Sequence, residues 1–200
     1  KSIFFLMLKK IIAFSFFEIS YINLPFHLYF ISSYYIISSI EAYSNLSRYG
    51  CNQFGEVFNN RKNDFAENRS FFLGSEVKKR ILLGSYLLIY KKGLKYVNYS
   101  FKFKNYLDIF FYNLFKNIDY ILTPSIIDKP LLIGESCKST SIYIQDSFNL
   151  LSSLSSLPSI SLCLFNDKNN LPYSFQITSN RFNDSLLISF SNFFFKNLIN

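Results

Sequence analysis

The sequence predicts an α/β fold, because segments with the pattern of β-strands alternate along it with segments that have the period of α-helices. Short runs rich in β-branched and aromatic residues, such as 118–122 and 173–178, predict strands. A longer segment, 34–49, repeats apolar residues every three to four positions and predicts a helix. The length of 200 residues suits one domain with a core. We therefore expect residues 1–200 to belong to a single domain.

The first half of the chain is predicted to be mainly helical. Its elements, in order, are the end of a helix at 1–10, a strand at 11–20, a helix that contains Tyr34, a polar loop at 50–70, a helix that begins at Ser75 and a helix over 101–115. Glu76 would lie in the first turn of its helix, where a negative charge is favourable. Glycine weakens a helix, so we expect interruptions near Gly84 and Gly93.

The second half is predicted to alternate between strands and helices. Its elements, in order, are a strand at 118–122 that ends before Pro124, a loop at 125–139, a helix at 142–156, a strand at 159–165, a turn at 167–170, a strand at 173–178 and a helix at 184–198. Pro158 cannot continue the helix before it, so it separates that helix from the next strand.

The formal net charge of +8 favours an anionic partner such as tRNA. The lysine and arginine residues look dispersed along the sequence, however, and no basic helix stands out. By itself, the charge is therefore weak support for a nucleic-acid partner.

The cysteines and the single histidine limit the chemistry that the chain can perform. Cys51, Cys137 and Cys163 are far apart, odd in number and form no CxxC pair, which favours a reducing compartment without disulfides. His27 is the only histidine, so no histidine pair can hold zinc, and a Ser-His-Asp triad would have to use this residue in its apolar context. We expect neither a metal site nor such a triad.

Two uncharged runs, Ile19–Ile40 and Ser147–Asn166, are long enough to span a bilayer. Each run contains a proline, asparagine and several serines, which a helix in lipid would carry less often. We therefore expect both runs to form core elements, and we expect no association with a membrane.

Five segments resemble the amidase signature family, in the order in which that family has them. They are LPFHLYFISSYYIISSIEAYSNLSRYG (24–50), SEVKKRILLGSYLL (75–88), NIDYILTPS (117–125), SIYIQDSFNLLSSLSSLPSISL (141–162) and LPYSFQI (171–177). Within the family they are most similar to the glutaminase subunits of tRNA-dependent amidotransferases. The resemblance covers nearly the whole chain. It implies the C-terminal part of the amidase signature fold, in which a mixed β-sheet lies between layers of α-helices.

The resemblance implies a glutaminase, which hydrolyses the side-chain amide of glutamine and releases ammonia for use elsewhere in a complex. Such a site must hold an amino acid by both ends. The family's pattern carries this role to Arg80 for the carboxylate and Asp146 for the ammonium, with Tyr34 contributing to the glutamine pocket. From pattern alone, a surface arginine beside Lys78 and Lys79, an exposed aspartate and a core aromatic residue would be the simpler interpretation.

The family's nucleophile is a serine in a Gly-Ser-rich stretch, activated by a second serine and a lysine without histidine. The resemblance places that stretch upstream of the segments matched here, in a catalytic portion that residues 1–200 lack. Ser152-Ser153 and Ser155-Ser156 do not have its glycines, so we assign no catalytic residue. We expect the segment alone to be inactive.

Three positions where the family has glycine carry other residues here, namely Ser156, Ser174 and Phe72. Loss of glycine where the backbone packs closely or takes a positive φ predicts local remodelling or relaxed selection. Two alternatives stay open: a stand-alone amidase of the same family, and a decayed, non-catalytic subunit kept for assembly. Arg80 and Asp146 favour the glutaminase over the stand-alone amidase, because a simple amide would not need clamps for both ends of an amino acid.

The resemblance also implies partners. The ammonia would convert Glu-tRNA(Gln) to Gln-tRNA(Gln) on a transamidase subunit that binds the tRNA and ATP with Mg²⁺, and a small third subunit would complete the complex. The tRNA would meet this chain mainly through the transamidase subunit, and this chain itself would need no cofactor. Such a complex works in a bacterial cytoplasm or in the matrix or stroma of an organelle.

Overall fold

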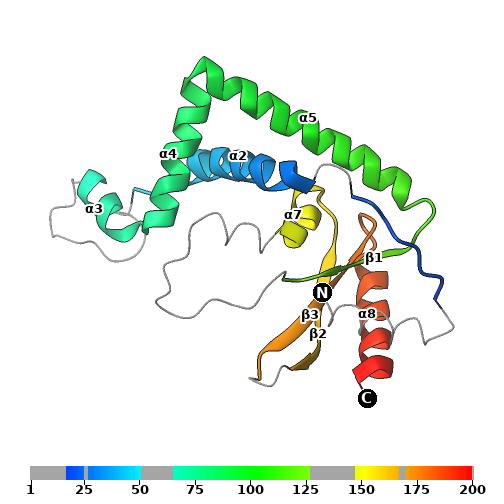
Figure 1. Ribbon diagram of the computed structural model, residues 1–200. Helices are drawn as coiled ribbons and strands as arrows, with labels where there is room; N and C mark the ends of the chain where they lie inside the picture. Colours follow the sequence, from blue (N-terminus) through cyan, green and yellow to red (C-terminus); the bar gives the residue numbers. More distant parts are fainter. Residues whose placement is uncertain (1–16, 25–26, 51–64, 127–146, 167–169, 200) are drawn as a thin grey trace. The chain divides into compact units, whose positions relative to one another are not determined.

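The chain forms two compact units (Figure 1). The computed structural model describes residues 17–24, 27–50, 65–126, 147–166 and 170–199. One unit comprises residues 1–31 and 106–200 and contains a β-sheet, whereas the other comprises residues 32–105 and is helical. Helices together with a sheet confirm the predicted α/β class. The expectation that residues 1–200 belong to one domain stays a prediction.

The sheet has three described strands, β1 (Tyr120–Pro124), β2 (Ser159–Asn166) and β3 (Pro172–Ser179). Their order is β1-β3-β2, and β3 pairs with both neighbours in antiparallel orientation. At the centre of the sheet, Ile177 lies opposite Leu122 of β1 and Ile160 of β2. Successive side chains of a strand point to opposite faces, so the neighbouring Gln176 belongs to the other face.

Helix α8 (Asp184–Ile199) covers one face of the sheet by packing on β2 and β3 (Figure 1). The buried side chains of this interface are Phe175, Ile177, Leu187 and Phe194. The ring centroids of Phe175 and Phe194 are 5.3 Å apart, and Tyr120 stacks on Phe190 at 4.0 Å. Burial, with a smaller contribution from the charge of Asp119, raises the pKa of Tyr120. Helix α7 (Ser147–Leu154) lies in the same unit.

The helical unit is built from α2 (His27–Leu46), α3 (Phe65–Phe72), α4 (Ser75–Ile89) and the first part of α5 (Lys91–Leu114). A single extended residue, Tyr90, with φ −90° and ψ 132°, separates α4 from α5. Helix α4 therefore ends through a local change of backbone conformation rather than through a long loop.

No interruption occurs near Gly84, contrary to the expectation from sequence, whereas the break at Tyr90 agrees with the interruption expected near Gly93. A Cβ atom on Gly84 would lie 2.2 Å from the carbonyl oxygen of Ser39 in α2. A Cβ atom on Gly93 would lie 2.5 Å from the carbonyl oxygen of Leu87 in α4. At both positions a neighbouring backbone comes too close for any side chain. Only glycine fits there, despite its low helix propensity.

Two further expectations were wrong. Residues 17–20 have no regular secondary structure where a strand end was predicted, and α3 occupies part of the predicted loop 50–70. Arg69 explains the helix, because its Nη1 donates to the carbonyl oxygen of Leu46 at 3.0 Å and to that of Tyr49. These bonds tie α3 to the end of α2. The elements expected at 1–16 and the start of the helix expected at 142 lie outside the described residues.

The described parts of the two uncharged runs contain irregular backbone as well as regular elements, since residues 19–24 have no regular secondary structure. The first includes the beginning of α2, and the second is divided between α7 and β2. Within the described ranges, no helix is both long and apolar enough to cross a membrane.

Candidate substrate-binding site

Tyr34 and Arg80, two of the three predicted substrate-binding residues, lie on α2 and α4 of the helical unit. The guanidinium carbon of Arg80 is 5.6 Å from the centre of the Tyr35 ring, a cation–π arrangement. Tyr34 meets Tyr35 edge to face, with ring centroids 6.2 Å apart. The structure thus brings both predicted residues to the same aromatic side chain.

Gly84 marks the place where the backbone of α4 contacts that of α2. Its backbone touches that of Ser39, as the 2.2 Å separation of a hypothetical Cβ atom shows. Arg80 precedes Gly84 by four residues and Tyr35 precedes Ser39 by four, which is about one turn on each helix. The glycine contact therefore sets the position of Arg80 against the tyrosine ring.

Arg80 is half-buried and has neither an ion pair nor a hydrogen bond to any residue in the described ranges. Its neighbour Lys79 differs, since it is exposed and pairs with Glu76 at 3.1 Å. A guanidinium beside an aromatic ring can keep N–H groups available for the two oxygens of a carboxylate. The arrangement can therefore bind a carboxylate at Arg80.

Asp146, the third predicted residue, lies outside the described residues. Helix α7 begins at the next position, Ser147. The placement of Asp146 relative to Arg80 stays a prediction. As far as the structure describes the chain, no group of three or more His, Cys, Asp or Glu side chains could hold a metal ion.

Helix α7 is joined to the polar face of the sheet through the hydroxyl group of Ser152. Ser152 Oγ accepts hydrogen bonds from Gln176 Nε2 at 2.8 Å and from Ser159 Oγ at 3.3 Å. It donates to the carbonyl oxygen of Asn149 at 3.1 Å. A hydroxyl group offers one donor and two acceptor positions, so all of them are used. Ser152 therefore has a structural role, and none of its described partners is a base that could activate it.

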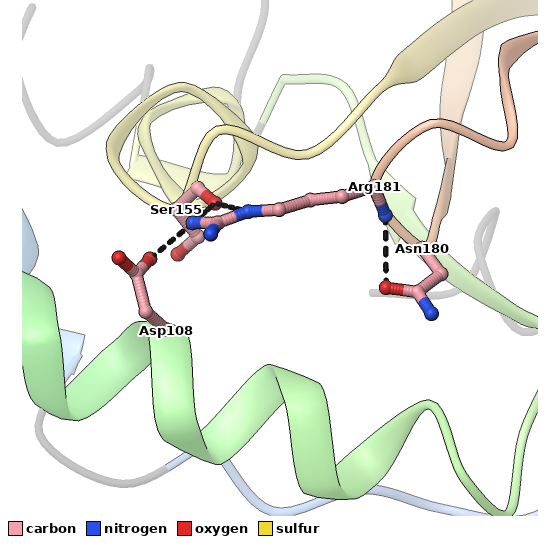
Figure 2. Close-up of polar contacts among 4 residues, drawn as sticks. All are labelled: Asp108, Ser155, Asn180 and Arg181. Carbon is pink, nitrogen blue, oxygen red and sulfur yellow. Dashed lines mark hydrogen bonds and ion pairs between the residues drawn. The ribbon is translucent and has the colours of Figure 1, made fainter.

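Arg181 holds the C-terminal end of α7 (Figure 2). Its Nε and Nη2 donate to the carbonyl oxygen of Ser155 at 3.2 and 2.7 Å, and its Nη2 pairs with Asp108 Oδ1 at 2.5 Å. The last carbonyl groups of a helix have no partner within the helix, so the guanidinium satisfies one of them. The Arg181 backbone N–H donates to Asn180 Oδ1 at 2.8 Å, which fixes the turn that presents the side chain.

Sequence reasoning did not single out Gln176 or Arg181. Gln176 served there only as part of the segment LPYSFQI, although an amide inside a predicted strand was a signal for a buried hydrogen bond. Gln176 Oε1 is buried and lacks a partner among the residues that are described. Arg181 gave no signal, because it lies in a turn and its partner Ser155 is 26 residues earlier.

Comparison with known proteins relates the chain to amidases. The amidase family matches residues 5–188. The A subunit of glutamyl-tRNA(Gln) amidotransferase from Ehrlichia chaffeensis is 36% identical over 174 residues, and the one from Clostridium novyi is 34% identical over 179 residues. Each alignment covers 86% of this chain and 36% of the relative. The chain thus spans about a third of the length of the curated relatives that it matches.

Two solved structures have the same fold. The A subunit of glutamyl-tRNA(Gln) amidotransferase from Thermotoga maritima superposes with a TM-score of 0.57 at 28% identity, over 83% of this chain and 32% of that chain. A bacterial aryl acylamidase of the amidase signature family superposes with a TM-score of 0.58 at 15% identity, over 84% and 33%. The second similarity concerns the fold alone. Both agree with the fold predicted from the five sequence segments.

Proposed function

We propose that this chain, which belongs to the amidase family, is part of the glutaminase subunit of a glutamyl-tRNA(Gln) amidotransferase. The observation that carries the proposal is Arg80, a half-buried cation that lies over Tyr35 and has no carboxylate partner in the described ranges. The identity to the corresponding subunits of two bacterial amidotransferases supports this branch of the family over a stand-alone amidase.

The subunit would hydrolyse the side-chain amide of glutamine. The amide C–N bond breaks, ammonia leaves, and the acyl group passes to water to give glutamate. A partner subunit that binds ATP and Mg²⁺ would use the ammonia to convert Glu-tRNA(Gln) to Gln-tRNA(Gln), with a small third subunit in the complex. The expected compartment is a bacterial cytoplasm or an organelle matrix or stroma.

Arg80 would bind the α-carboxylate of glutamine, and Asp146 would bind its ammonium group. Tyr34 would line the pocket beside them, since it already meets the ring on which Arg80 rests. The nucleophile would come from the Gly-Ser-rich part of the family that lies outside the five matched segments. The saturated hydroxyl group of Ser152 supports this assignment, because it is engaged in holding α7.

The test is Arg80→Lys in the complete subunit, produced together with its partners. Lysine keeps the charge and loses the planar fork, so the loss should fall on carboxylate binding. Removing one side of a buried charge pair, as Asp146→Asn does, costs roughly 2–5 kcal/mol, which is a factor of about 30 to 5,000, and Arg80→Lys should cost less because it keeps the charge. We expect glutamine-dependent transamidation to fall at least about tenfold, whereas ammonia-dependent transamidation stays near normal.

The matched control is Lys79→Gln, which removes the adjacent exposed cation and should leave both rates unchanged. Asp146→Asn should behave like Arg80→Lys, because it removes the charge opposite the substrate ammonium. If both rates fall together in Arg80→Lys, the residue holds the fold or an interface with a partner. If neither rate falls, the substrate role is wrong.

One observation favours a second candidate, a non-catalytic subunit kept for assembly. Ser156 has a φ of 54° where the family has glycine, so a replacement that strains the backbone has been tolerated. An assembled wild-type complex that uses ammonia but not glutamine would support this candidate instead of the glutaminase.

A further inference from the structure

The net charge of the chain is concentrated in one stretch. Residues 77–107 contain eight basic side chains and no Asp or Glu. The other 13 basic residues are matched in number by the 13 acidic residues, so the formal charge of +8 arises from these 31 residues alone. Such a separation of charge is typical of a surface that meets a polyanion.

Helix α5 gathers most of this charge on one continuous element. Its basic side chains are Lys91, Lys92, Lys95, Lys102 and Lys104. At about 100° per residue, Lys91, Lys95 and Lys102 fall within about 40° of one another around the helix axis. All three are exposed. They form a stripe along the outer face of the helix, opposite the buried side that contains Val97 and Ser100.

Exposed tyrosines lie beside this stripe. Tyr99 is 65% exposed and Tyr96 is 59% exposed. Around the helix axis, Tyr99 falls between Lys95 and Lys92. An exposed aromatic ring offers a face on which an unpaired base can stack, and this stacking depends little on the identity of the base.

The α5 lysines are not neutralised by the protein. None of the five makes an ion pair with any residue that the structure describes. The lysines of α4 differ, because Lys79 pairs with Glu76 and Lys78 Nζ donates to the carbonyl oxygen of Ser70. Like charges spaced along one helix repel each other, and a bound polyanion would remove that repulsion.

We propose that the outer face of α5 from Lys91 to Lys102 binds the phosphate backbone of RNA, with Tyr99 available to an unpaired base. The inference rests on the proposed function, in which the RNA is the tRNA that carries the glutamate. It adds a direct contact by this chain to the contacts of the partner subunit. RNA fits better than an acidic protein, because it supplies regularly spaced negative charges together with faces for stacking.

The test is the triple variant Lys91→Gln, Lys95→Gln, Lys102→Gln in the assembled amidotransferase. Glutamine is a good helix former, so α5 should keep its structure. Binding of a tRNA(Gln) transcript is measured over a range of salt concentrations. Each lost phosphate contact should reduce the slope of log K against log salt by about 0.7–0.9. We expect a total reduction of about 2 to 3, with weaker binding at low salt.

The matched control, Lys79→Gln with Lys116→Gln and Lys196→Gln, removes the same charge from exposed positions elsewhere. It should leave the slope nearly unchanged. An equal change in both triple variants, or no change in either, overturns the proposal. Failure of the α5 variant to assemble with its partners also overturns it, because the face would then bind a partner protein.

Glutamine hydrolysis is measured in the same preparations, so that a failure of the RNA contact can be distinguished from a failure of the proposed function. An unchanged salt slope with normal glutaminase activity contradicts the RNA contact alone. Absence of glutaminase activity in the wild-type complex contradicts the proposed function, and the RNA measurement can still be interpreted.

Discussion

The two faces of strand β3 are both buried, but they are buried in different ways. On the side of α8, Phe175 and Ile177 are 2% and 0% exposed and pack among apolar side chains. On the side of α7, Gln176 and Thr178 are 5% and 2% exposed, and Gln176 donates a hydrogen bond to Ser152. One strand thus joins an apolar interface to a polar one.

The apolar face contributes mainly to the stability of the unit, whereas the polar face contributes mainly to the position of α7. Apolar burial is roughly proportional to area and does not depend on direction, so the α8 face can stabilise the unit without fixing any one contact. A hydrogen bond requires a defined geometry, so the α7 face fixes where the helix lies. Helix α7 directly follows Asp146, and it is held by Ser152 and by the Arg181 contact to Ser155. Because α7 begins directly after Asp146, we expect the polar face to influence that residue more than the apolar face does.

Phe175→Ala should disrupt the apolar interface between β3 and α8, and it should lower the free energy of unfolding more than the other variants do. Truncation of a buried phenylalanine costs roughly 3–5 kcal/mol, because transfer energy is lost and a cavity opens against Phe194. Urea unfolding of the protein should shift to a clearly lower midpoint, and all elements of the sheet unit should lose protection in hydrogen exchange. A loss below about 1 kcal/mol would mean that the unit depends little on this core.

Gln176→Leu should affect the polar side and have a smaller, more local effect. The variant loses the bond to Ser152 but also removes the unpaired Oε1, so the free energy of unfolding should fall by only about 1 kcal/mol. Amide exchange of α7 should accelerate, while exchange at α8 stays unchanged. The separation of roles between the faces is wrong if the loss equals that of Phe175→Ala, or if α7 exchange does not change.

Two elements of the second half could be predicted closely from sequence because local signals mark their ends, whereas β1, expected to end before Pro124, includes that residue. Strand β2 was predicted at 159–165 after Pro158 and spans Ser159–Asn166, and α8 was predicted at 184–198 and spans Asp184–Ile199. Roles for Tyr34 and Arg80 could be expected only from the family resemblance, and the structure places both beside Tyr35. Their spacing in the sequence, in separate helices, contains no information about distance.

The misjudged features depend on contacts between distant parts of the chain. A glycine costs about 0.5–1 kcal/mol in a helix, which predicts an interruption near Gly84 that the structure does not have. The close backbone of Ser39 in α2 overrides that cost at Gly84, and no local pattern reveals it. Lys91, Lys95 and Lys102, which look dispersed in the sequence, share one face because α5 is a continuous helix from Lys91 to Leu114.

Ser156 lies just beyond α7, so a substitution there tests how the end of this helix is stabilised. Leu157 N donates to the carbonyl oxygen of Ser152 at 3.0 Å, and Ser156 N donates to that of Ser153 at 3.4 Å. This is the bond pattern of a Schellman motif, in which the residue at position 156 takes a positive φ and glycine is preferred. The observed φ of 54° agrees with that assignment.

Ser156→Gly should therefore stabilise the protein slightly. A side chain in the left-handed region costs roughly 1–2 kcal/mol, whereas glycine loses an extra 0.5–1 kcal/mol or so of backbone entropy on folding. The relief of strain is larger, so we expect a gain of about 0.5–1 kcal/mol. The matched variant Ser153→Gly, at an exposed position inside α7, should instead lose about 0.5–1 kcal/mol. If urea unfolding shows a gain in stability for Ser156→Gly and a loss for Ser153→Gly, the backbone is strained at residue 156. If both variants lose stability, Arg181 and Gln176 hold the end of α7 without such strain.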